Sequence, residues 1–395
     1  MVRVRVDKVV AEGDGLGRLE DGRVVFVEGA LPGEVVDVEI VRQSRDYARA
    51  VTVSVVEANS ERVDAPCPHV ARGCGGCDLQ HASVPLQRRI KRDIVSESLT
   101  RIAKLVDPEV RTVVEQLATE GWRSSVRAAV DAEGRIGFRR RRSNDVVAID
   151  RCLVADRRLD AVFASQSFTG QSFTSESSGV DEVSLRVGDD DHVSVWAEPV
   201  VGSADDRLAI TVEGATLRVS SGSFFQSSAA GAAALSAAVR RALGEPSGWP
   251  EGAFLDAYGG IGLFARTVAP PERRVILVEA NPFAAEDARA NLAHDGATHE
   301  HTVFAGRFED WSPEPVAVAV ADPSRDGLRA TAVGILRTAA PAVLALVSCD
   351  PASLGRDTRL LIDAGFEFEW SEVVDLFPHT HHVEVVSRFV RRDRL

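Results

Sequence analysis

The chain has 395 residues, of which 45% are hydrophobic and 27% are charged. This balance is typical of a folded protein with two or three domains, and it excludes wholesale disorder and a collagen-like chain. No apolar run approaches the ~20 residues that a membrane span needs, and the first residues lack the apolar core of a signal peptide. We therefore expect a cytoplasmic protein with no membrane partner.

The net charge is −13, from 46 basic and 59 acidic residues, which taken alone argues against a nucleic-acid partner. The charge is unevenly distributed, because residues 88–145 contain 14 basic and 9 acidic side chains. Most of the cations are arginines, whose planar fork can bond phosphate in a bidentate manner, although a general arginine bias explains the same ratio. We expect the basic residues of 88–92 and 139–142 to contact phosphate groups and to make binding strongly dependent on salt.

Residues 1–56 alternate between short valine-rich stretches and glycine-rich turns, a pattern that predicts five short strands. Five such strands suggest a β-barrel of the OB type, which often binds oligonucleotides. Residues 57–220 follow as a second, β-rich region. Within that region, apolar residues at helical spacing predict a helix over 85–105, which we expect to pack on the C-terminal domain.

Between residues 221 and 395, apolar strand-like runs alternate with predicted helices. This alternation predicts an α/β domain with a doubly wound, parallel sheet of the Rossmann type. In such sheets ligands bind beyond the carboxyl ends of the strands. The predicted fold class is therefore α/β, with a β-barrel and a β-rich region preceding a Rossmann-like domain.

Three of the five cysteines, Cys67, Cys74 and Cys77, lie within eleven residues of each other. The odd number of cysteines and their spacing disfavour disulfides and favour a metal site, since thiolates bind zinc or iron–sulfur clusters. The glycines between Cys74 and Cys77 allow a tight turn that directs both sulfurs to one centre. The spacing does not distinguish zinc from a cluster, and three incidental buried thiols are the simpler alternative. A fourth ligand is needed, and four other side chains could supply it: His69, His81, Cys152 and Cys349.

The first predicted strand of the C-terminal domain ends in DAYGGIG, where Gly260 and Gly262 form a G-x-G turn that opens a helix. Glycines at this place allow the backbone to approach a nucleotide-like ligand closely. Glu279 ends the next strand and is placed to accept hydrogen bonds from ribose hydroxyls. The third glycine of the dinucleotide fingerprint is absent, so the pattern fits S-adenosylmethionine better than NAD.

Two later strands end in residues that can do chemistry, Asp322 and Cys349, and Glu384 lies near the C-terminus. A cysteine beside a cofactor cleft can act as a nucleophile once it is ionised, although an isolated cysteine is more often a small buried apolar residue. A lone glutamate after His381 and His382 is usually a solvated strand residue. The two histidines lack the helical spacing of a zinc motif, so we do not assign them a metal.

Taken in order, these motifs resemble the RNA 5-methyluridine methyltransferase family, whose members methylate C5 of uridine in tRNA or rRNA. GDGLGR and FVEGALPGE resemble a TRAM domain, and CPHVARGCGGCDLQH with Cys152 is similar to the four cysteines that hold a four-iron, four-sulfur cluster. The C-terminal half is similar through six motifs in order: SFFQ, DAYGGIG, LVEANP, DPSRDG, VSCDPA and HVE. The resemblance spans nearly the whole chain and implies domains at 1–56, 57–220 and 221–395, the last a class I methyltransferase domain.

The resemblance implies a covalent mechanism. Cys349 as thiolate adds to C6 of uracil, C5 then accepts the methyl group, and Glu384 removes the C5 proton. Further residues are implied at the cofactor and the base: Gln226, Tyr258, Gly260, Gly262, Glu279 and Asp322 at S-adenosylmethionine, and Phe224 and Arg325 at the substrate. The implied ligands of the 4Fe-4S cluster are Cys67, Cys74, Cys77 and Cys152, with zinc as the less favoured occupant. Because the target base must leave its stack, we expect the substrate to be a single-stranded or flipped uridine. We expect the protein to be a monomer.

Two other functions remain open. The first is an RNA-binding or RNA-folding module with a vestigial methyltransferase half, which the barrel favours and the presence of both Cys349 and Glu384 disfavours. The second is a small-molecule methyltransferase, which leaves the cysteines and the barrel unexplained. The chain also departs from the family pattern at Leu263, Arg307 and Ser324, close to the expected cofactor.

Overall fold

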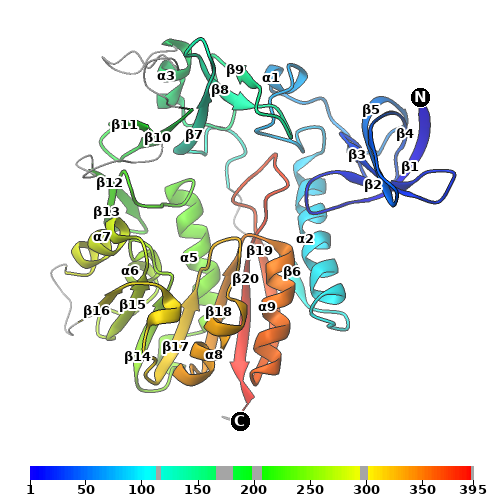
Figure 1. Ribbon diagram of the computed structural model, residues 1–395. Coiled ribbons are helices and arrows are strands. Elements are labelled where there is room, and N and C mark those ends of the chain that lie inside the picture. The colour runs from blue at the N-terminus through cyan, green and yellow to red at the C-terminus, as the bar shows by residue number, and fades with distance from the viewer. Residues whose placement is uncertain (113–116, 166–180, 198–206, 294–300, 393–395) are drawn as a thin grey trace.

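The computed structural model describes residues 1–112, 117–165, 181–197, 207–293 and 301–392. Three regions follow one another along the chain: a closed barrel, a central antiparallel sheet and an eight-stranded mixed sheet. Figure 1 shows the barrel at the upper right beside helix α2 (Val84–Arg101), the central sheet at the top and the eight-stranded sheet below. No helix in the described part of the chain is long and apolar enough to cross a membrane.

The barrel is built from five strands in the order β1-β2-β3-β5-β4. In β1, Val4 and Val6 are buried while Arg3 and Arg5 are exposed, because successive side chains of a strand point to opposite faces. Valines of β1, β3 and β4 and alanines of β5 fill the interior. The strand bounds are β1 (Val2–Val9), β2 (Gly15–Arg18), β3 (Val24–Glu28), β4 (Val35–Gln43) and β5 (Tyr47–Glu57).

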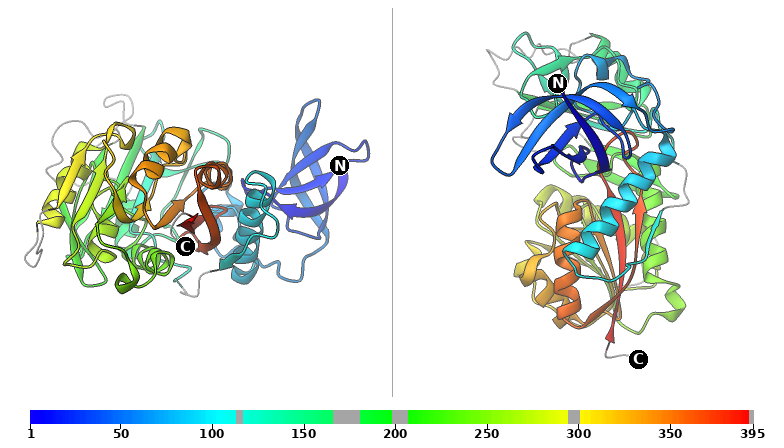
Figure 2. Two further views of the ribbon diagram at one scale, coloured as in Figure 1. Left: turned by 90° about the horizontal axis from the view of Figure 1, so that it is seen from below. Right: turned by 90° about the vertical axis from the view of Figure 1, so that its right-hand side faces the viewer.

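Helix α2 connects the barrel with the C-terminal sheet. Ile90, Ile94 and Leu99, whose spacing predicts a helix, are all buried. Ile102 has the same spacing but is 41% exposed, because it follows the last helical residue and no longer extends the apolar face. The helix packs along α9 (Pro351–Asp363) and touches β1, and Figure 2 shows it between the barrel and the sheet.

The central sheet is antiparallel and has the strand order β11-β10-β7-β8-β9. Its apolar face packs against Leu159 and Phe163. The strand bounds are β7 (Ser125–Val130), β8 (Ile136–Arg139), β9 (Val146–Ala148), β10 (Glu182–Val187) and β11 (Val193–Ala197). Short helices accompany the sheet: α1 (Pro68–Ala71), η1 (Arg157–Leu159) and α3 (Asp160–Ser165). The hairpin of β12 (Arg207–Val212) and β13 (Ala215–Ser220) packs instead against helices of the C-terminal domain.

The eight-stranded sheet has the order β16-β15-β14-β17-β18-β20-β19-β6. Five of its strands are parallel and run together: β14 (Ala253–Ala257), β15 (Val275–Glu279), β16 (Thr302–Ala305), β17 (Val316–Ala321) and β18 (Val343–Ser348). The last strand, β20 (Glu384–Arg391), is antiparallel to both of its neighbours, β18 and β19 (Phe366–Val374). At the edge, β6 (Val110–Thr112) runs parallel to β19.

Helices cover both faces of this sheet, which explains why every residue of β17 is buried. Apolar side chains of α5 (Ala229–Leu243), α6 (Leu263–Thr267) and α7 (Pro282–Leu292) pack on one face. Side chains of α2, α8 (Arg329–Ala339) and α9 pack on the other. The remaining short helices are η2 (Pro246–Gly248) and η3 (Phe308–Asp310). The predicted fold class, a β-barrel and a β-rich region followed by a Rossmann-like α/β domain, is confirmed.

The connection between β19 and β20, residues 375–383, is called the strap below. In Figure 1 it is the red loop that rises from the sheet toward the central region and α2. It leads directly into Glu384, the first residue of β20.

Candidate active site

A cavity of about 580 Å³ lies at the carboxyl ends of β14, β15, β17 and β18. Its volume falls in the range of small-molecule sites, roughly 300 to 1,000 Å³. Nearly all residues expected at the cofactor and the base line it: Phe224, Gln226, Tyr258, Gly260, Glu279, Asp322, Arg325, Cys349 and Glu384. Gly262 is not part of the lining and caps α6 instead.

The glycine turn at one end of the cavity is held by Glu279. Its Oε2 atom accepts a hydrogen bond from the backbone N–H of Gly260 at 2.9 Å, and its Oε1 atom accepts one from the N–H of Asn281 at 2.6 Å. Gly260 and Gly262 have φ angles of +55° and +88°, the left-handed region that glycine adopts without strain. Each oxygen of Glu279 keeps a second lone pair, so the carboxylate can still accept a hydrogen bond from a ligand.

Beside the turn, Tyr258 belongs to a small aromatic cluster. Its hydroxyl donates a hydrogen bond to Oε1 of Glu309 at 3.3 Å, and its ring lies against Phe308 with the centroids 5.2 Å apart. Arg307, one of the departures from the family pattern, forms an ion pair with the same carboxylate at 3.3 Å. The family pattern has an acidic or amide residue near the position of Arg307. Glu309, two residues later, supplies an acidic group here, and it was not predicted from the sequence.

Cys349 follows the last residue of β18 and comes two residues before the first residue of α9. Burial, followed by the charges of Glu384 and Asp322, raises the pKa of its thiol to about 12, and the charge of Arg325 opposes this rise. The thiol is therefore protonated in the free site. Forming the thiolate requires an added positive charge, or the loss of a negative one, beside the sulfur.

Two carboxyl groups of the cavity also hold their protons strongly. Burial and then the charge of Glu279 raise the pKa of Asp322 to about 7. Burial and then the charge of Asp322 raise the pKa of Glu384 well above its usual value. Within the described residues, no ion pair of at most 4.0 Å is found for the carboxyl groups of Glu279, Asp322 or Glu384. The cavity therefore has unbalanced acidic character, which suits a cationic ligand and general acid–base chemistry.

The SFFQ segment places one aromatic ring and one amide at the cavity. Phe224 is 69% exposed although it is a large apolar residue, whereas Phe225 and Gln226 are buried. An exposed aromatic face at a cavity is a surface on which a nucleobase can stack. Leu263 and Ser324, the other departures from the family pattern, line the cavity without blocking it.

The cavity contains residues that sequence reasoning did not select. The strap contributes Phe377, Thr380, His382 and Val383, and the central region contributes Arg123. Burial, with the charges of His381 and Arg325, lowers the pKa of His382 to about 4, so this ring is neutral. No local pattern identifies these residues, because only the packing of distant segments brings them to the cavity.

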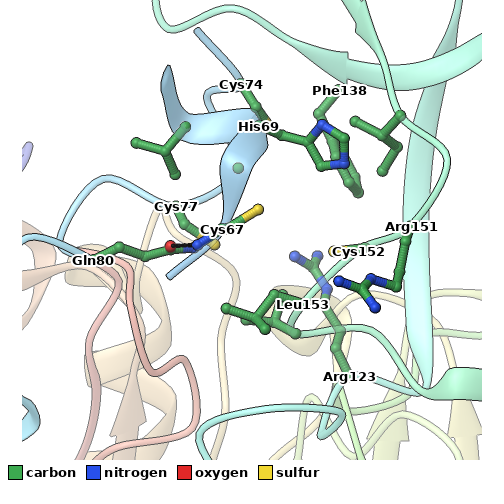
Figure 3. A pocket seen from close by; sticks show the side chains of 14 residues that line it. Cys67, His69, Cys74, Cys77, Gln80, Arg123, Phe138, Arg151, Cys152 and Leu153 are labelled. Atoms are coloured by element: carbon green, nitrogen blue, oxygen red, sulfur yellow. Dashed lines mark hydrogen bonds between the residues drawn. The ribbon is translucent and has the colours of Figure 1, made fainter. Parts of the chain in front are cut away.

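The four expected cluster ligands line a second, smaller pocket of about 30 Å³, shown in Figure 3. In this view the side chains of Cys67, Cys77 and Cys152 point toward one space. Burial is the main cause that raises the pKa of the Cys74 and Cys152 thiols, and it raises the pKa of Cys77 to about 12. Within the described residues, no group of three or more His, Cys, Asp or Glu side chains forms a site for a metal ion.

The structure separates the four candidates for a fourth ligand. Cys152 lines the small pocket, whereas Cys349 lines the large cavity. His69 also lines the small pocket, but its Nε2 lies 3.1 Å from Asp150 and its Nδ1 lies 3.1 Å from Arg72. His81 is not part of the lining.

The chain turns at Gly75 and Gly76, as the sequence predicts, but neither glycine has a positive φ angle. A Cβ atom at Gly75 would lie 2.7 Å from the carbonyl oxygen of Arg139, to which the N–H of Gly75 donates a hydrogen bond. Glycine is therefore needed at position 75 because two backbones come into contact.

The basic residues expected to contact phosphate form ion pairs within the chain. Arg88 and Lys91 bind Asp375, and Arg89 binds Glu61. In the second run, Arg139 pairs with Glu182, and both Arg141 and Arg142 pair with Asp14. These charges are already balanced, so contacts between these residues and phosphate stay a prediction.

Comparisons with known proteins agree with this arrangement. A model of the TRAM domain matches residues 1–53. An uncharacterized RNA methyltransferase of Streptomyces coelicolor is 34% identical over 97% of this chain and 91% of its own length. The 23S rRNA (uracil(1939)-C(5))-methyltransferase RlmD of Shewanella amazonensis is 30% identical over 98% of this chain and 95% of its own length. The chain belongs to the RNA uracil-C5 methyltransferase family.

A solved structure shares the fold of this family member over its whole length. The tRNA (uracil-54, C5)-methyltransferase of Pyrococcus abyssi, in complex with S-adenosyl-L-homocysteine, superposes with a TM-score of 0.73 at 23% identity. The match covers 98% of this chain and 99% of the other. The barrel, the central sheet and the methyltransferase domain therefore form one architecture that the two proteins share.

Proposed function

We propose that this chain transfers a methyl group from S-adenosylmethionine to C5 of a uridine in RNA, with Cys349 as nucleophile and Glu384 as base. One observation carries the proposal: Cys349, Glu384 and the glycine turn at Gly260 line a single cavity. The names of the relatives support uracil as the base, since they act on uracil C5 of 23S rRNA or tRNA.

The cavity fits S-adenosylmethionine by volume and by charge. When bound, this cofactor supplies an electrophilic methyl group on a positively charged sulfonium. Uncompensated carboxyls attract such a cation, and Glu279 can still accept hydrogen bonds from ribose hydroxyls. The residues that we assign to the cofactor all line the cavity, namely Gln226, Tyr258, Gly260, Glu279 and Asp322, and Gly262 shapes the turn beside them.

The chemistry follows from the poor nucleophilicity of uracil C5. Addition of the Cys349 thiolate to C6 gives C5 enolate character, so that C5 can take up the methyl group. Glu384 then removes the C5 proton, and the electrons of that bond expel the thiolate and restore the C5–C6 double bond. Cys349 is thereby released for the next cycle.

The substrate side of the cavity favours an unstacked base. Phe224 presents an exposed ring on which the uracil can stack, and Arg325 is an exposed cation at the same cavity. We assign Arg325 to a phosphate beside the target nucleotide. A base within a helix cannot reach Cys349, so the expected substrate is a single-stranded or flipped uridine.

We further propose that Cys67, Cys74, Cys77 and Cys152 hold a 4Fe-4S cluster. All four line one pocket, and thiolates are the ligands of such clusters. Zinc is the less favoured occupant of the same four thiolates. Either group would join the segment 67–77 to the loop at Cys152.

Transfer of a labelled methyl group to RNA tests the main proposal. We expect 5-methyluridine in RNA incubated with the wild type and labelled S-adenosylmethionine, and none with Cys349→Ala. Asp150→Ala is a control, because its side chain is 81% exposed and lies outside the cavity, so that the nucleophile stays in place. If Cys349→Ala stays folded and methylates RNA at the wild-type rate, the covalent mechanism is wrong.

The same experiment separates the two alternatives. RNA binding that survives in Cys349→Ala, together with no methyl transfer by the wild type, supports an RNA-binding module with a vestigial methyltransferase half. Methyl transfer to nucleosides but not to RNA supports a small-molecule enzyme.

A further inference from the structure

The strap has two sides. Its side chains Phe377, Thr380, His382 and Val383 line the cavity, and Glu384 follows as the first residue of β20. On the opposite side, hydrogen bonds join the strap to residues 78–91, which lie roughly 290 positions earlier in the chain. These bonds therefore contribute to the position of the base.

Helix α2 holds the first half of the strap. The Nζ atom of Lys91 donates hydrogen bonds to Oδ1 of Asp375 at 2.7 Å and to the carbonyl oxygen of Phe377 at 2.8 Å. The Oε1 atom of Gln87 accepts a hydrogen bond from the N–H of His379 at 2.7 Å. Lys91 and Gln87 are completely buried, so no solvent competes for these bonds.

Asp78 and Leu79, which directly follow the cysteine segment 67–77, hold the second half of the strap. The N–H of Leu79 donates a hydrogen bond to the carbonyl oxygen of His379 at 2.9 Å. Asp78, which directly follows Cys77, binds His381 twice: Oδ1 accepts from its backbone N–H at 2.8 Å, and Oδ2 is hydrogen-bonded to its Nδ1. The side chain of Asp78 is only 9% exposed, and Arg141 lies 3.8 Å from the same carboxylate.

These hydrogen bonds determine which side of the strap His381 faces. Asp78 is hydrogen-bonded to both the backbone N–H and the ring of His381, so His381 lies on the outer side of the strap. The adjacent His382 and the base Glu384 line the cavity on the inner side. His381, to which Asp78 is hydrogen-bonded, lies three residues before the base in sequence.

We propose that Asp78 is a positioning residue for Glu384, which it orients through His381. The inference rests on the proposed function, because it takes proton removal by Glu384 as the step that depends on Asp78. A displacement of the base by about 1 Å is expected to slow that step up to about 10²-fold. Addition of Cys349 and methyl transfer come earlier and do not need the base.

A positioning role predicts a specific kinetic signature. If the base is misplaced, methylated RNA stays attached to Cys349, so the covalent protein–RNA adduct accumulates while free product falls. A loss of folding or of RNA binding lowers adduct and product together. The ratio of adduct to product therefore separates positioning from a purely structural role.

The experiment uses the full-length protein with RNA and labelled S-adenosylmethionine, and it resolves adduct and product on a denaturing gel. For Asp78→Ala we expect product formation to fall about 10- to 100-fold, adduct to accumulate as in Glu384→Gln, and the KM for S-adenosylmethionine to be unchanged. Asp78→Asn should restore much of the turnover, because its amide can still accept from the N–H of His381.

Asp150→Ala is the matched control. Asp150 lies two residues from Cys152 and contacts His69, but its side chain is 81% exposed and does not reach the strap. We expect a wild-type ratio of adduct to product for this variant. His381→Ala removes the ring that Asp78 binds without altering the cysteine segment, so it tests the same contact if Asp78→Ala does not fold.

Amide hydrogen exchange provides a readout that does not require RNA. Exchange at residues 379–384 should speed up in Asp78→Ala and stay at the wild-type rate in Asp150→Ala. Wild-type turnover in Asp78→Ala and His381→Ala, or a parallel loss of adduct and product in both, overturns the inference. Absence of methyl transfer and of adduct in the wild type itself contradicts the proposed function instead.

Discussion

The thiol of Cys349 and the carboxyl groups of Asp322 and Glu384 all have a raised pKa, and the three groups share the causes. Burial acts on the thiol, on Asp322 and on Glu384, and the charge of each carboxyl adds to the effect on its neighbours. Such a site keeps its protons until a cation enters, because a positive charge lowers all of these pKa values together. Binding of the sulfonium cofactor would thereby prepare both the nucleophile and the base.

Asp322→Asn should stabilise the protein at alkaline pH. Because the folded-state pKa of Asp322 is raised from 3.8 to about 7, its stabilising contribution is present below pH 4 and is lost as the pH rises through 7. Asparagine cannot ionise and avoids this loss. We expect a melting temperature a few degrees above the wild type at pH 8.5 and a clearly smaller difference at pH 5, measured without cofactor. An equal shift at both pH values would contradict this origin.

Arg325→Ala should slow the addition of Cys349 to the base. Arg325 lowers the pKa of the thiol, so its removal raises that pKa further and reduces the thiolate fraction. We expect adduct to form about tenfold more slowly at pH 7, with partial recovery as the pH rises. If Arg325 also binds a phosphate, the salt dependence of RNA affinity should weaken by about one unit of slope. Arg325→Lys keeps the charge and serves as the control.

At the scale of elements, α2 is more than a connector between domains. Its Lys91 is completely buried and is bound by Asp375 of the strap, so two ionised groups are held inside the protein. Each charge depends on the other, because an unpaired buried charge is far more costly than the pair.

Lys91→Met should destabilise the protein by about 3 kcal/mol in urea unfolding at pH 7. Methionine preserves the packing but leaves Asp375 with Arg88 alone, at 3.2 Å. Adding Asp375→Asn to this variant should recover part of the loss, because it removes the unpaired charge. If the double variant is as unstable as the sum of the two single variants, the pair is not coupled.

The elements themselves could largely be predicted from the sequence, since their signals are local. The alternation in β1 and the apolar spacing of Ile90, Ile94 and Leu99 report the faces that these segments bury. The cavity lining was predictable where a motif ends a strand, as at Glu279 and Cys349. Arg123 and His382 were not, because distant segments bring them to the site and no short pattern encodes that contact.

At the scale of the whole molecule, the pocket of four cysteines joins two segments of the central region. The segment 67–77 and the loop at Cys152 meet there, and Arg123 lines both this pocket and the active-site cavity. A cluster at this place would stabilise the central region and, through the segment that also bears Asp78, the strap.

Protein purified without oxygen should be brown and contain about four iron atoms per chain. Cys152→Ser should lose the visible absorbance, and its melting temperature should fall by several degrees because binding energy of the cluster is lost from the folded state. The matched control is Cys349→Ser, which should keep its iron. A colourless wild type with one zinc would show that the assignment of the cluster is wrong.

The distribution of charge over the whole molecule was the least predictable property. The basic runs at 88–92 and 139–142 look like a surface for phosphate in the sequence, yet their side chains pair with carboxylates such as Asp375 and Asp14. Those carboxylates come from other regions of the chain, so a count along a window of sequence cannot reveal the neutralisation.

The dependence of the strap on residues 78–91 has a consequence for biosynthesis. Lys91 leaves the ribosome 284 residues before the aspartate that neutralises it, and Asp78 leaves 303 residues before its histidine. A nascent chain can complete its barrel early, but it cannot close the catalytic pocket until residues 375–384 have been synthesised. Products that terminate before β20 would therefore be inert toward RNA methylation, however much of the enzyme they contain.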